Sequence, residues 1–469
     1  MKNIALHNLG CKVNSYEMDV MQEKLEEKGY KIVSFAPGAD IYIINTCTVT
    51  NIADRKSRQM LHRAKKMNPH AVVVAVGCYV QTGAEKLKMD PCIDLAIGNN
   101  RKKDIVSILE EYLELKQGNI QDMTLQEAVI EDINDPKQEY EEMTLTHTGE
   151  HTRAYIKIQD GCNQFCSYCI IPFARGRVRS RREEDILKEA RGLVEAGYQE
   201  IVVTGIHLSS YGLDFIKKDS NDYGQGVDIR RQAYGKGFLI DILEKIHDIE
   251  GLKRLRVGSL EPRIITEDFV HRLRKMDKLC PHFHLSLQSG CNETLQRMNR
   301  FYTAEEYRDK VELIRRFFDN PALTTDVIVG FPGETQEEFE KTYRYLKEIN
   351  FFEMHVFKYS KREGTVAAAR EDQIPEEIKA KRSEILLNLA REQSDSYRRG
   401  YLGQEITVLI EETKILDKEE YQIGHTPSYL KVAIKKKEDM KNCLVRGKAV
   451  GILKGEYLLI EVRETGSLD

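Results

Sequence analysis

The sequence predicts an α/β protein in three parts: an N-terminal domain with a parallel sheet, a central partial (β/α)6 barrel and a small C-terminal antiparallel β-barrel. Short apolar runs alternate with helical patterns over the first 116 residues, and this alternation begins again near Arg153. About 65 residues at the end alternate apolar and polar side chains, with glycine at the turns. A chain of 469 residues also exceeds one ordinary domain. We expect the boundaries 1–116, 117–147, 148–398 and 399–466.

The N-terminal part alternates strand and helix patterns, which predicts a small parallel sheet covered by helices. Three cysteines, Cys11, Cys47 and Cys78, each come at or just beyond the end of a predicted strand. Because the carboxyl ends of parallel strands share one edge, we expect these thiols to converge. The alternative is that they are small buried apolar residues. Cys92 precedes a strand at the opposite end and is interpreted as structural. Strands are expected near residues 2–6, 41–44, 71–76 and 93–97, and helices at 15–28, 53–67, 81–89 and 101–116.

Residues 118–150 lose this periodicity and are acidic and weakly apolar, which predicts a linker between domains that runs over the surface. The barrel follows, with strands expected near 153–159, 200–204, 253–258, 282–288, 323–329 and 352–359. Thr303 with Glu306, and Thr335 with Glu338, are typical capping boxes at the starts of two helices. A polar insertion at 214–237 is either functional or disordered. Six such units predict a partial barrel, whose functional site lies at the carboxyl ends of the strands.

Cys162, Cys166 and Cys169 directly follow the first barrel strand. Soft thiolates select iron–sulfur clusters or zinc, and a complete site of either kind needs a fourth ligand. No further cysteine follows nearby. A cluster held by three cysteines therefore keeps one iron open for another ligand. The alternative is a zinc site completed by a distant residue.

This cysteine loop, with Tyr168 before its last cysteine, resembles the signature of the radical S-adenosylmethionine (SAM) enzymes. Its flanks, residues 157–161 and 170–176, are similar to those of the methylthiotransferases, as are residues 9–14, 44–50 and 76–78. The resemblance implies two [4Fe–4S] clusters. The cluster on Cys162, Cys166 and Cys169 would cleave SAM to a 5′-deoxyadenosyl radical, and the auxiliary cluster on Cys11, Cys47 and Cys78 would carry the sulfur. It also implies that Tyr168, Gly205, Gln288 and Gly330 contact SAM.

The C-terminal part resembles a TRAM domain, an RNA-binding module, most clearly at residues 424–432. Within the methylthiotransferases, residues 11–14 and 424–426 are most similar to the branch that modifies N6-threonylcarbamoyladenosine at tRNA position 37. The resemblance implies addition of a methylthio group to carbon 2 of that base. Another modified adenosine, or an aspartate of a ribosomal protein, is the alternative substrate. A non-enzymatic iron–sulfur or RNA-binding protein is the remote alternative.

The net charge of −4 does not indicate nucleic-acid binding, so RNA contacts must come from local patches. Arg175, Arg177 and Arg179, with Arg181 and Arg182, follow the cysteine loop and could bind phosphate. Lys435 and Lys436, with Lys437, Tyr429 and His425, form the second predicted patch. A solvated charged face and a structural or dimerising barrel are the respective alternatives. The expected RNA is the anticodon stem-loop of tRNA, and the expected reductant is an electron donor such as flavodoxin or ferredoxin.

The sequence contains no run of about 18 apolar residues, so no membrane span is expected. The start of the chain lacks the apolar core of a signal peptide. Ten cysteines in a chain of this class indicate a reducing compartment and metal binding, not disulfides. We therefore expect a cytoplasmic protein.

Overall fold

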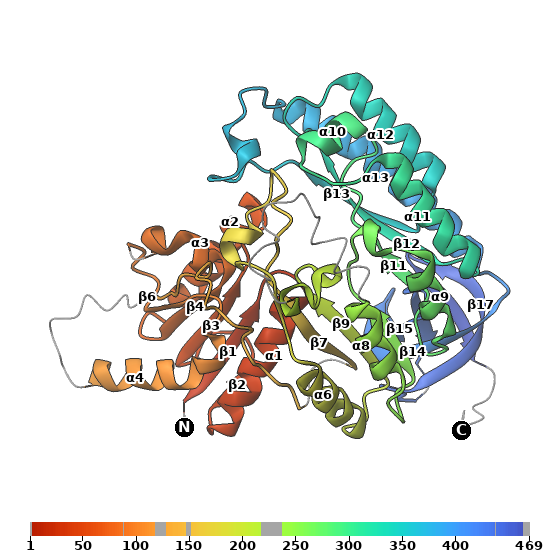
Figure 1. The fold of residues 1–469 in the computed structure, drawn as a ribbon. Helices are drawn as coiled ribbons and strands as arrows, with labels where there is room; N and C mark the ends of the chain where they lie inside the picture. Colours follow the sequence, from red (N-terminus) through yellow and green to blue (C-terminus); the bar gives the residue numbers. More distant parts are fainter. Residues whose placement is uncertain are drawn as a thin grey trace.

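The computed structural model describes residues 2–87, 89–117, 128–146, 152–216, 237–436 and 438–462. Figure 1 shows three parts in chain order: an α/β domain at the N-terminus, a central set of βα units, and a small β-barrel beside the C-terminus. This is the fold class that the sequence predicts. The segment 217–236, which contains nearly all of the predicted insertion, lies outside the described residues.

The N-terminal domain is a six-stranded parallel sheet in the order β2-β1-β3-β4-β5-β6. All four predicted strands are present, together with two short ones, β2 and β6. Alternate side chains of β3 and β4 face opposite sides, so Ile43 and Val74 join one apolar cluster while Tyr42 and Val73 join another. The elements are β1 (Asn3–Asn8), α1 (Lys12–Glu27), β2 (Lys31–Val33), β3 (Ile41–Thr46), α2 (Asn51–Met67), β4 (Val72–Gly77), α3 (Cys78–Leu87), β5 (Leu95–Ile97), η1 (Lys102–Asp104), α4 (Ile105–Gln117) and β6 (Ala128–Val129).

The predicted surface linker is wrong for residues 128–146. Strand β6 pairs with β5 and completes the sheet. Met143 and Leu145 are buried in the main apolar cluster, and Glu141 is also buried. Ile133 is buried as well, so three apolar side chains anchor this stretch, while many of its polar residues stay exposed. Residues 118–127 and 147–151 lie outside the described residues.

The barrel has the six predicted strands, in the spatial order β7-β9-β10-β11-β12-β13, all parallel. An isolated bridge between Leu260 and Leu285 links the two halves. Within the described residues β7 does not pair with β13, so the barrel is open. The strands are β7 (Arg153–Asp160), β8 (Arg179–Ser180), β9 (Glu200–Gly205), β10 (Arg254–Val257), β11 (His282–His284), β12 (Ala322–Val329) and β13 (Glu353–Lys358).

Two helices of the barrel begin where the sequence predicts. Both capping boxes are confirmed, at Thr303 with Glu306 and at Thr335 with Glu338. The helices are α5 (Ile171–Ala174), α6 (Glu183–Glu195), α8 (Phe238–His247), α9 (Glu267–Lys275), α10 (Asn292–Arg297), α11 (Ala304–Phe317), α12 (Gln336–Ile349) and α13 (Glu376–Arg399), with short 3-10 turns at η2 (Leu208–Ser210), η3 (Leu213–Phe215), η5 (Pro262–Ile264) and η6 (Val366–Ala369).

The N-terminal domain contacts both edges of the open barrel. Helix α1 packs against β7 and β9. On the other side, Arg362, which follows β13, forms an ion pair with Asp54 at 2.7 Å and donates a hydrogen bond to Thr48 at 2.8 Å. The N-terminal domain therefore packs against the barrel at both of its open edges.

The C-terminal part is a closed barrel in the order β14-β15-β16-β18-β17. It is antiparallel as predicted except for β16 and β18, which pair in parallel. Strand β15 was not expected. The strands are β14 (Glu405–Leu416), β15 (Glu419–His425), β16 (Lys431–Lys435), β17 (Leu444–Leu453) and β18 (Tyr457–Val462). No helix in the described ranges is both long and apolar enough to cross a membrane.

Candidate active site between the N-terminal domain and the barrel

Cys162, Cys166 and Cys169 lie on the loop between β7 and α5, at the carboxyl end of the barrel. The loop is fastened by hydrogen bonds from Cys162 N to Gly176 O at 3.0 Å and from Ser167 N to Met298 O at 3.0 Å. Gly161 has φ +70°, and a Cβ there would lie 1.8 Å from the carbonyl oxygen of Arg177. Only glycine therefore fits before the first cysteine.

The four predicted SAM contacts lie at the same end of the barrel. Gly205 ends β9, Gln288 follows β11 and Gly330 follows β12, while Tyr168 belongs to the cysteine loop. Gln288 is held in place by both its backbone groups, N to Asp326 O at 2.8 Å and O from Ile328 N at 2.9 Å. Tyr168 packs edge-to-face on Phe331, with ring centroids 6.5 Å apart. Their contacts with SAM remain a prediction.

Glu334, which follows Gly330 in the turn after β12, has a structural role. Glu334 accepts a hydrogen bond from Gly330 N at 2.6 Å and forms an ion pair with Arg382 at 2.6 Å. Both side chains are buried. Glu334 thus fixes the turn after β12 to helix α13.

Cys11, Cys47 and Cys78 converge at the carboxyl edge of the N-terminal sheet. Cys11 is the N-cap of α1, Cys47 follows β3, and Cys78 is the first residue of α3. Asn14 ties their loops together, because its side-chain amide donates to Leu9 O at 2.8 Å and Thr46 O at 3.0 Å. Gly77 has φ +99°, and a Cβ there would lie 2.6 Å from Asn45 Oδ1. This close approach brings the three thiols to one place.

The thiols of each trio are close enough to influence one another. Burial raises the pKa of Cys47 to about 11, and Cys78 and Cys11 push that pKa in the same direction. Burial also raises the pKa of Cys169, with further contributions from Cys166 and Cys162. Without metal the Cys47 and Cys169 thiols are therefore protonated at neutral pH, and a metal centre must displace these protons when it binds.

Neither cysteine trio is closed around a single zinc ion. A tetrahedral zinc site with Zn–S bonds of 2.3 Å needs sulfurs roughly 3.8 Å apart. Within the described residues, two groups have all ligand atoms within 4.8 Å of one another, and neither cysteine trio is among them. The two closer groups are His62 with Asp90 and Cys92, and His284 with Asp326 and His355.

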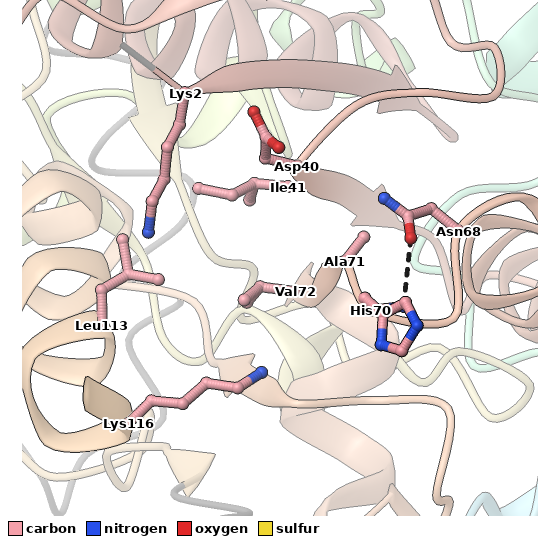
Figure 2. Close-up of a pocket in the computed structure, with 9 residues that line it drawn as sticks. All are labelled: Lys2, Asp40, Ile41, Asn68, His70, Ala71, Val72, Leu113 and Lys116. Atoms are coloured by element: carbon pink, nitrogen blue, oxygen red, sulfur yellow. Dashed lines mark hydrogen bonds between the residues drawn. The ribbon is translucent and has the colours of Figure 1, made fainter. Parts of the chain in front are cut away.

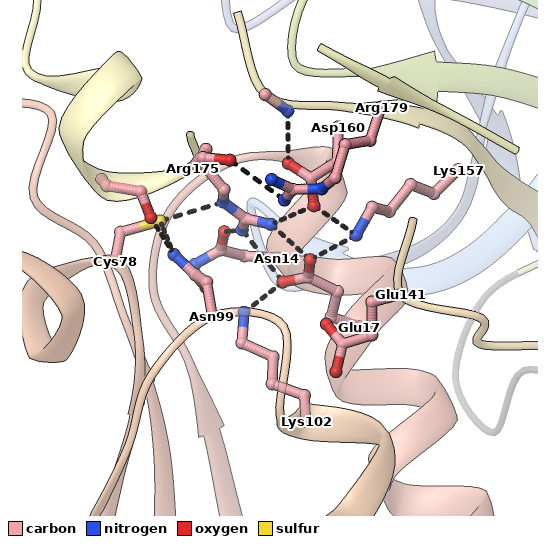
Figure 3. A network of polar contacts seen from close by, with 12 residues as sticks. Asn14, Glu17, Cys78, Asn99, Lys102, Glu141, Lys157, Asp160, Arg175 and Arg179 are labelled. Atoms are coloured by element: carbon pink, nitrogen blue, oxygen red, sulfur yellow. Dashed lines mark hydrogen bonds and ion pairs between the residues drawn. The ribbon is translucent and has the colours of Figure 1, made fainter. Parts of the chain in front are cut away.

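Arg175 and Arg179 do not have the predicted role of RNA contacts, because both are buried. The guanidinium of Arg175 forms ion pairs with Glu17 and Asp160, as Figure 3 shows. Burial alone would lower the pKa of Arg175, but Cys78, Glu17 and Asp160 raise it well above its ordinary value. Arg179 donates to Arg175 O at 3.0 Å. Both cations therefore belong to the interior of the junction.

Arg177 is the member of the predicted arginine group that stays exposed beside the cysteine loop. Its guanidinium lies 4.4 Å from the ring centroid of Phe165, which is also exposed. Arg181 is fully buried and bound to Glu189, and Arg182 is exposed at the start of α6.

The second predicted patch is also divided by the structure. Lys435 and Lys436 are on the surface, but they form ion pairs with Glu419 at 2.8 Å and with Glu420 at 3.3 Å. Tyr429 faces the barrel instead, where its ring stacks on His282 at 4.9 Å. Tyr429 and His425 therefore hold the C-terminal barrel in place, and Lys437 lies outside the described residues.

Arg300 is a residue of the site that sequence reasoning missed. Its Nη1 donates to Cys166 Sγ at 3.2 Å, although 134 positions separate them. Nε also donates to the hydroxyl of Tyr302 at 3.0 Å. Glu17 and Asn14, which bind Arg175, were missed as well. No local pattern marks these residues, because each acts across a domain or barrel contact.

A separate cavity of about 260 Å³ lies at the other end of the N-terminal sheet, near the starts of the strands (Figure 2). His70 and Asn68 form one side of it, joined by a hydrogen bond from His70 N to Asn68 Oδ1 at 3.1 Å. Cysteines of neither trio line it. It is therefore distinct from the cysteine site.

The chain matches two family models that correspond to its first two domains. Residues 156–346 match the radical SAM superfamily, and residues 3–98 match a family described as uncharacterized protein family UPF0004. A Bacillus subtilis protein named threonylcarbamoyladenosine tRNA methylthiotransferase MtaB is 40% identical over 97% of this chain and 95% of its own length. The chain belongs to the radical SAM methylthiotransferase family.

Other relatives in the family agree with this assignment. An Aquifex aeolicus protein with the same name is 38% identical over 88% of this chain and 94% of its own. A Clostridium botulinum protein named tRNA-2-methylthio-N(6)-dimethylallyladenosine synthase is 35% identical over 86% and 85%. A solved radical SAM methyltransferase, TsrM from Kitasatospora setae, aligns with a TM-score of 0.53 at 14% identity, covering 78% of this chain and 74% of its own. That likeness shows a shared fold.

Proposed function

We propose that this enzyme adds a methylthio group to carbon 2 of N6-threonylcarbamoyladenosine at position 37 of tRNA. Two relatives that carry the name of this activity are 40% and 38% identical over most of the chain. The observation that carries the proposal is that two cysteine trios, from different domains, lie at one junction. Arg175, six residues after Cys169, reaches the sulfur of Cys78 at 3.1 Å.

The reaction needs cofactor chemistry, because no side-chain acid or base removes the unactivated hydrogen from carbon 2 of adenine at neutral pH. When bound, the two [4Fe–4S] clusters and SAM supply one-electron cleavage of SAM at one site and sulfur delivery at the other. Cys162, Cys166 and Cys169 would hold the first cluster. The trio of the N-terminal domain would hold the second, and an external one-electron donor such as flavodoxin or ferredoxin would supply the electron.

The chain's own contribution is to place the base between the two sites and to keep water away. Helix α1 packs against β7 and β9, and Arg362 joins the opposite edge, so the N-terminal domain closes the open side of the barrel. Tyr168, Gly205, Gln288 and Gly330 are placed to orient SAM at the carboxyl ends of the strands. These positions bring the reacting atoms together without free diffusion.

The anticodon stem-loop of tRNA would bind at the opening of this junction. Exposed Arg177 beside exposed Phe165 offers a cation for phosphate and a ring for stacking on a base. Lys435 and Lys436 on the C-terminal barrel, a TRAM-like RNA-binding module, supply more distant contacts if the RNA displaces their glutamate partners. Because tRNA is the substrate, we place the reaction in the cytoplasm.

A second modified adenosine is the main alternative substrate, since relatives from Clostridium botulinum at 34–35% identity are named for N6-dimethylallyladenosine. An aspartate of a ribosomal protein is less favoured by these names. Mass analysis of tRNA nucleosides from a strain without the gene separates the three. We expect loss of the methylthio form of threonylcarbamoyladenosine alone, and loss of another nucleoside, or of none, would refute the assignment.

Two triple variants test the roles of the trios. Anaerobically reconstituted wild-type protein should hold about eight irons, four for each cluster. Replacement of Cys162, Cys166 and Cys169 with alanine should halve the iron and abolish SAM cleavage. Replacement of Cys11, Cys47 and Cys78 should also halve the iron, keep SAM cleavage and block methylthio transfer. If this second variant still modified tRNA, the assigned role of its cluster would be wrong.

A further inference from the structure

Each cysteine trio receives a hydrogen bond from one arginine that lies outside its own loop. Arg175 Nε donates to Cys78 Sγ at 3.1 Å, and Arg300 Nη1 donates to Cys166 Sγ at 3.2 Å. Arg175 belongs to the barrel and Cys78 to the N-terminal domain, so this contact crosses the junction (Figure 3). The two contacts are alike in donor, acceptor and length.

The surroundings of Arg175 fix its orientation and offset its charge. Nη2 donates to Asn14 Oδ1 at 2.7 Å and to Glu17 Oε2 at 2.9 Å, and Nη1 lies 3.2 Å from Asp160 Oδ2. Every N–H direction of the guanidinium is therefore used, which leaves Nε aimed at the sulfur. Lys157 forms ion pairs with both carboxylates, at 2.8 Å to Glu17 and 2.7 Å to Asp160.

Arg300 differs because its partners are neutral. Besides Cys166, it donates to the hydroxyl of Tyr302 at 3.0 Å and to Ser286 O at 3.3 Å. Within the described ranges of the chain, it forms no ion pair with a carboxylate. Burial alone would lower the pKa of Arg300, and the carboxylate of Glu261 raises it less than Tyr302 and Cys166 do. The charge of Arg300 is therefore offset less than that of Arg175, which pairs directly with Glu17 and Asp160.

Charge and hydrogen bonds at the sulfurs are two of the factors that set the reduction potential of an iron–sulfur cluster. A cation that donates to a thiolate favours the reduced cluster, which carries one more negative charge. We propose that Arg300 and Arg175 are positioning residues that raise the potentials of the two clusters unequally, and so direct the incoming electron to the cluster that cleaves SAM. This rests on the proposed function. The electron comes from the external donor, and no bond is made or broken.

The test is a redox titration monitored by electron paramagnetic resonance, in proteins that retain one cluster because the other trio is replaced with alanine. Arg300→Gln should disfavour reduction of the cluster on Cys162, Cys166 and Cys169 by about tenfold, or about 59 mV for one electron. Arg175→Gln should shift the auxiliary cluster in the same direction but less, since its charge is partly offset. Neither variant should move the other cluster.

Two further variants separate this electrostatic effect from damage to the fold. Glu17→Gln should shift the auxiliary cluster the opposite way, because it removes an anion that offsets Arg175. Arg181→Gln is the matched control: Arg181 is as buried as Arg175, but it binds Glu189 and no cysteine. If Arg175→Gln does not fold, Arg175→Lys, which keeps the charge but loses the planar fork, should give a smaller shift of the same sign.

The outcomes are decisive in both directions. Equal shifts at the two clusters, an unchanged potential in Arg300→Gln, or a shift of the same sign in Arg175→Gln and Glu17→Gln would overturn the proposal. These measurements use no tRNA. Their results therefore do not depend on the choice of substrate, which nucleoside analysis decides.

Discussion

At the scale of single residues, the position of a charged side chain in sequence does not reveal which way it points. Arg175 and Arg177 are two residues apart, yet Arg175 is buried in ion pairs while Arg177 lies exposed over Phe165. The difference arises because α5 ends at Ala174, and the chain then passes between the domains. Arg175 therefore belongs to the interior, and Arg177 stays exposed beside the cysteine loop.

Replacement of Arg177 with alanine should weaken tRNA binding through the loss of a phosphate contact. The slope of log affinity against log salt should become less steep by about one. Filter binding or anisotropy over a range of salt concentrations measures this. Arg191→Ala, which removes an exposed arginine from α6, is the matched control and should leave the slope unchanged. The same slope in Arg177→Ala and wild type would remove Arg177 from the RNA interface.

At the scale of elements, local signals in the sequence were the most dependable. The capping box before α11 forms in full: Glu306 N donates to Thr303 Oγ1 at 3.1 Å, and Thr303 N donates to Glu306 Oε2 at 2.8 Å. Both partners lie within four residues, so nothing distant is needed to form them. In contrast, the two-residue β6 and the seven-residue β15 escaped prediction, and both are defined by their pairing with a neighbouring strand.

Replacement of Thr303 with alanine should destabilise the protein by about 1 kcal/mol, the usual value of a lost N-cap. Chemical unfolding followed by circular dichroism measures the change. Thr303→Ser keeps the hydroxyl and should recover most of the loss. Because the cap lies on the outside of the barrel, iron content should not change. A drop in iron would show that α11 has a direct part in holding the cluster loop.

At the scale of the whole molecule, the three parts meet at the ring of Tyr429. Arg153 and Arg256 of the barrel lie 5.2 and 4.8 Å from its centroid, and Lys12 of the N-terminal domain lies at 5.8 Å. Arg256 also donates to Pro427 O at 2.9 Å and forms an ion pair with Glu200 at 2.7 Å. The C-terminal barrel is therefore held by a cation cluster that Glu200 helps to balance.

This arrangement predicts a dependence of stability on pH. Burial alone would raise the pKa of Glu200, but Arg256 outweighs it, so the pKa lies below the ordinary value of 4.5. As pH falls, the unfolded chain takes up the proton first. The stabilisation is thus complete above about 4.5 and is lost as pH falls from there to the folded pKa. Unfolding midpoints in urea should fall more between about pH 5 and about pH 3 in wild type than in Glu200→Gln. Parallel curves would exclude Glu200 as the titrating group.

Much of the fold and the grouping of the six cysteines into two trios followed from the sequence alone. The spacing of Cys162, Cys166 and Cys169, the repeated βα pattern and the two capping boxes depend on neighbours in the chain, so they can be recognised without a structure. The convergence of Cys11, Cys47 and Cys78 was also predictable, because equivalent positions on parallel strands must share an edge.

Tertiary structure decided which charged groups contact the cysteine sulfurs and which face solvent. Arg175 reaches Cys78 across 97 positions, and Arg300 reaches Cys166 across 134. Tyr429 likewise turned from the predicted RNA face to the junction of the domains. Such contacts depend on how packed elements meet, and a long cation can pair with whichever anion or sulfur the packing brings near. Residue type and spacing do not indicate that partner, so only the folded structure shows it.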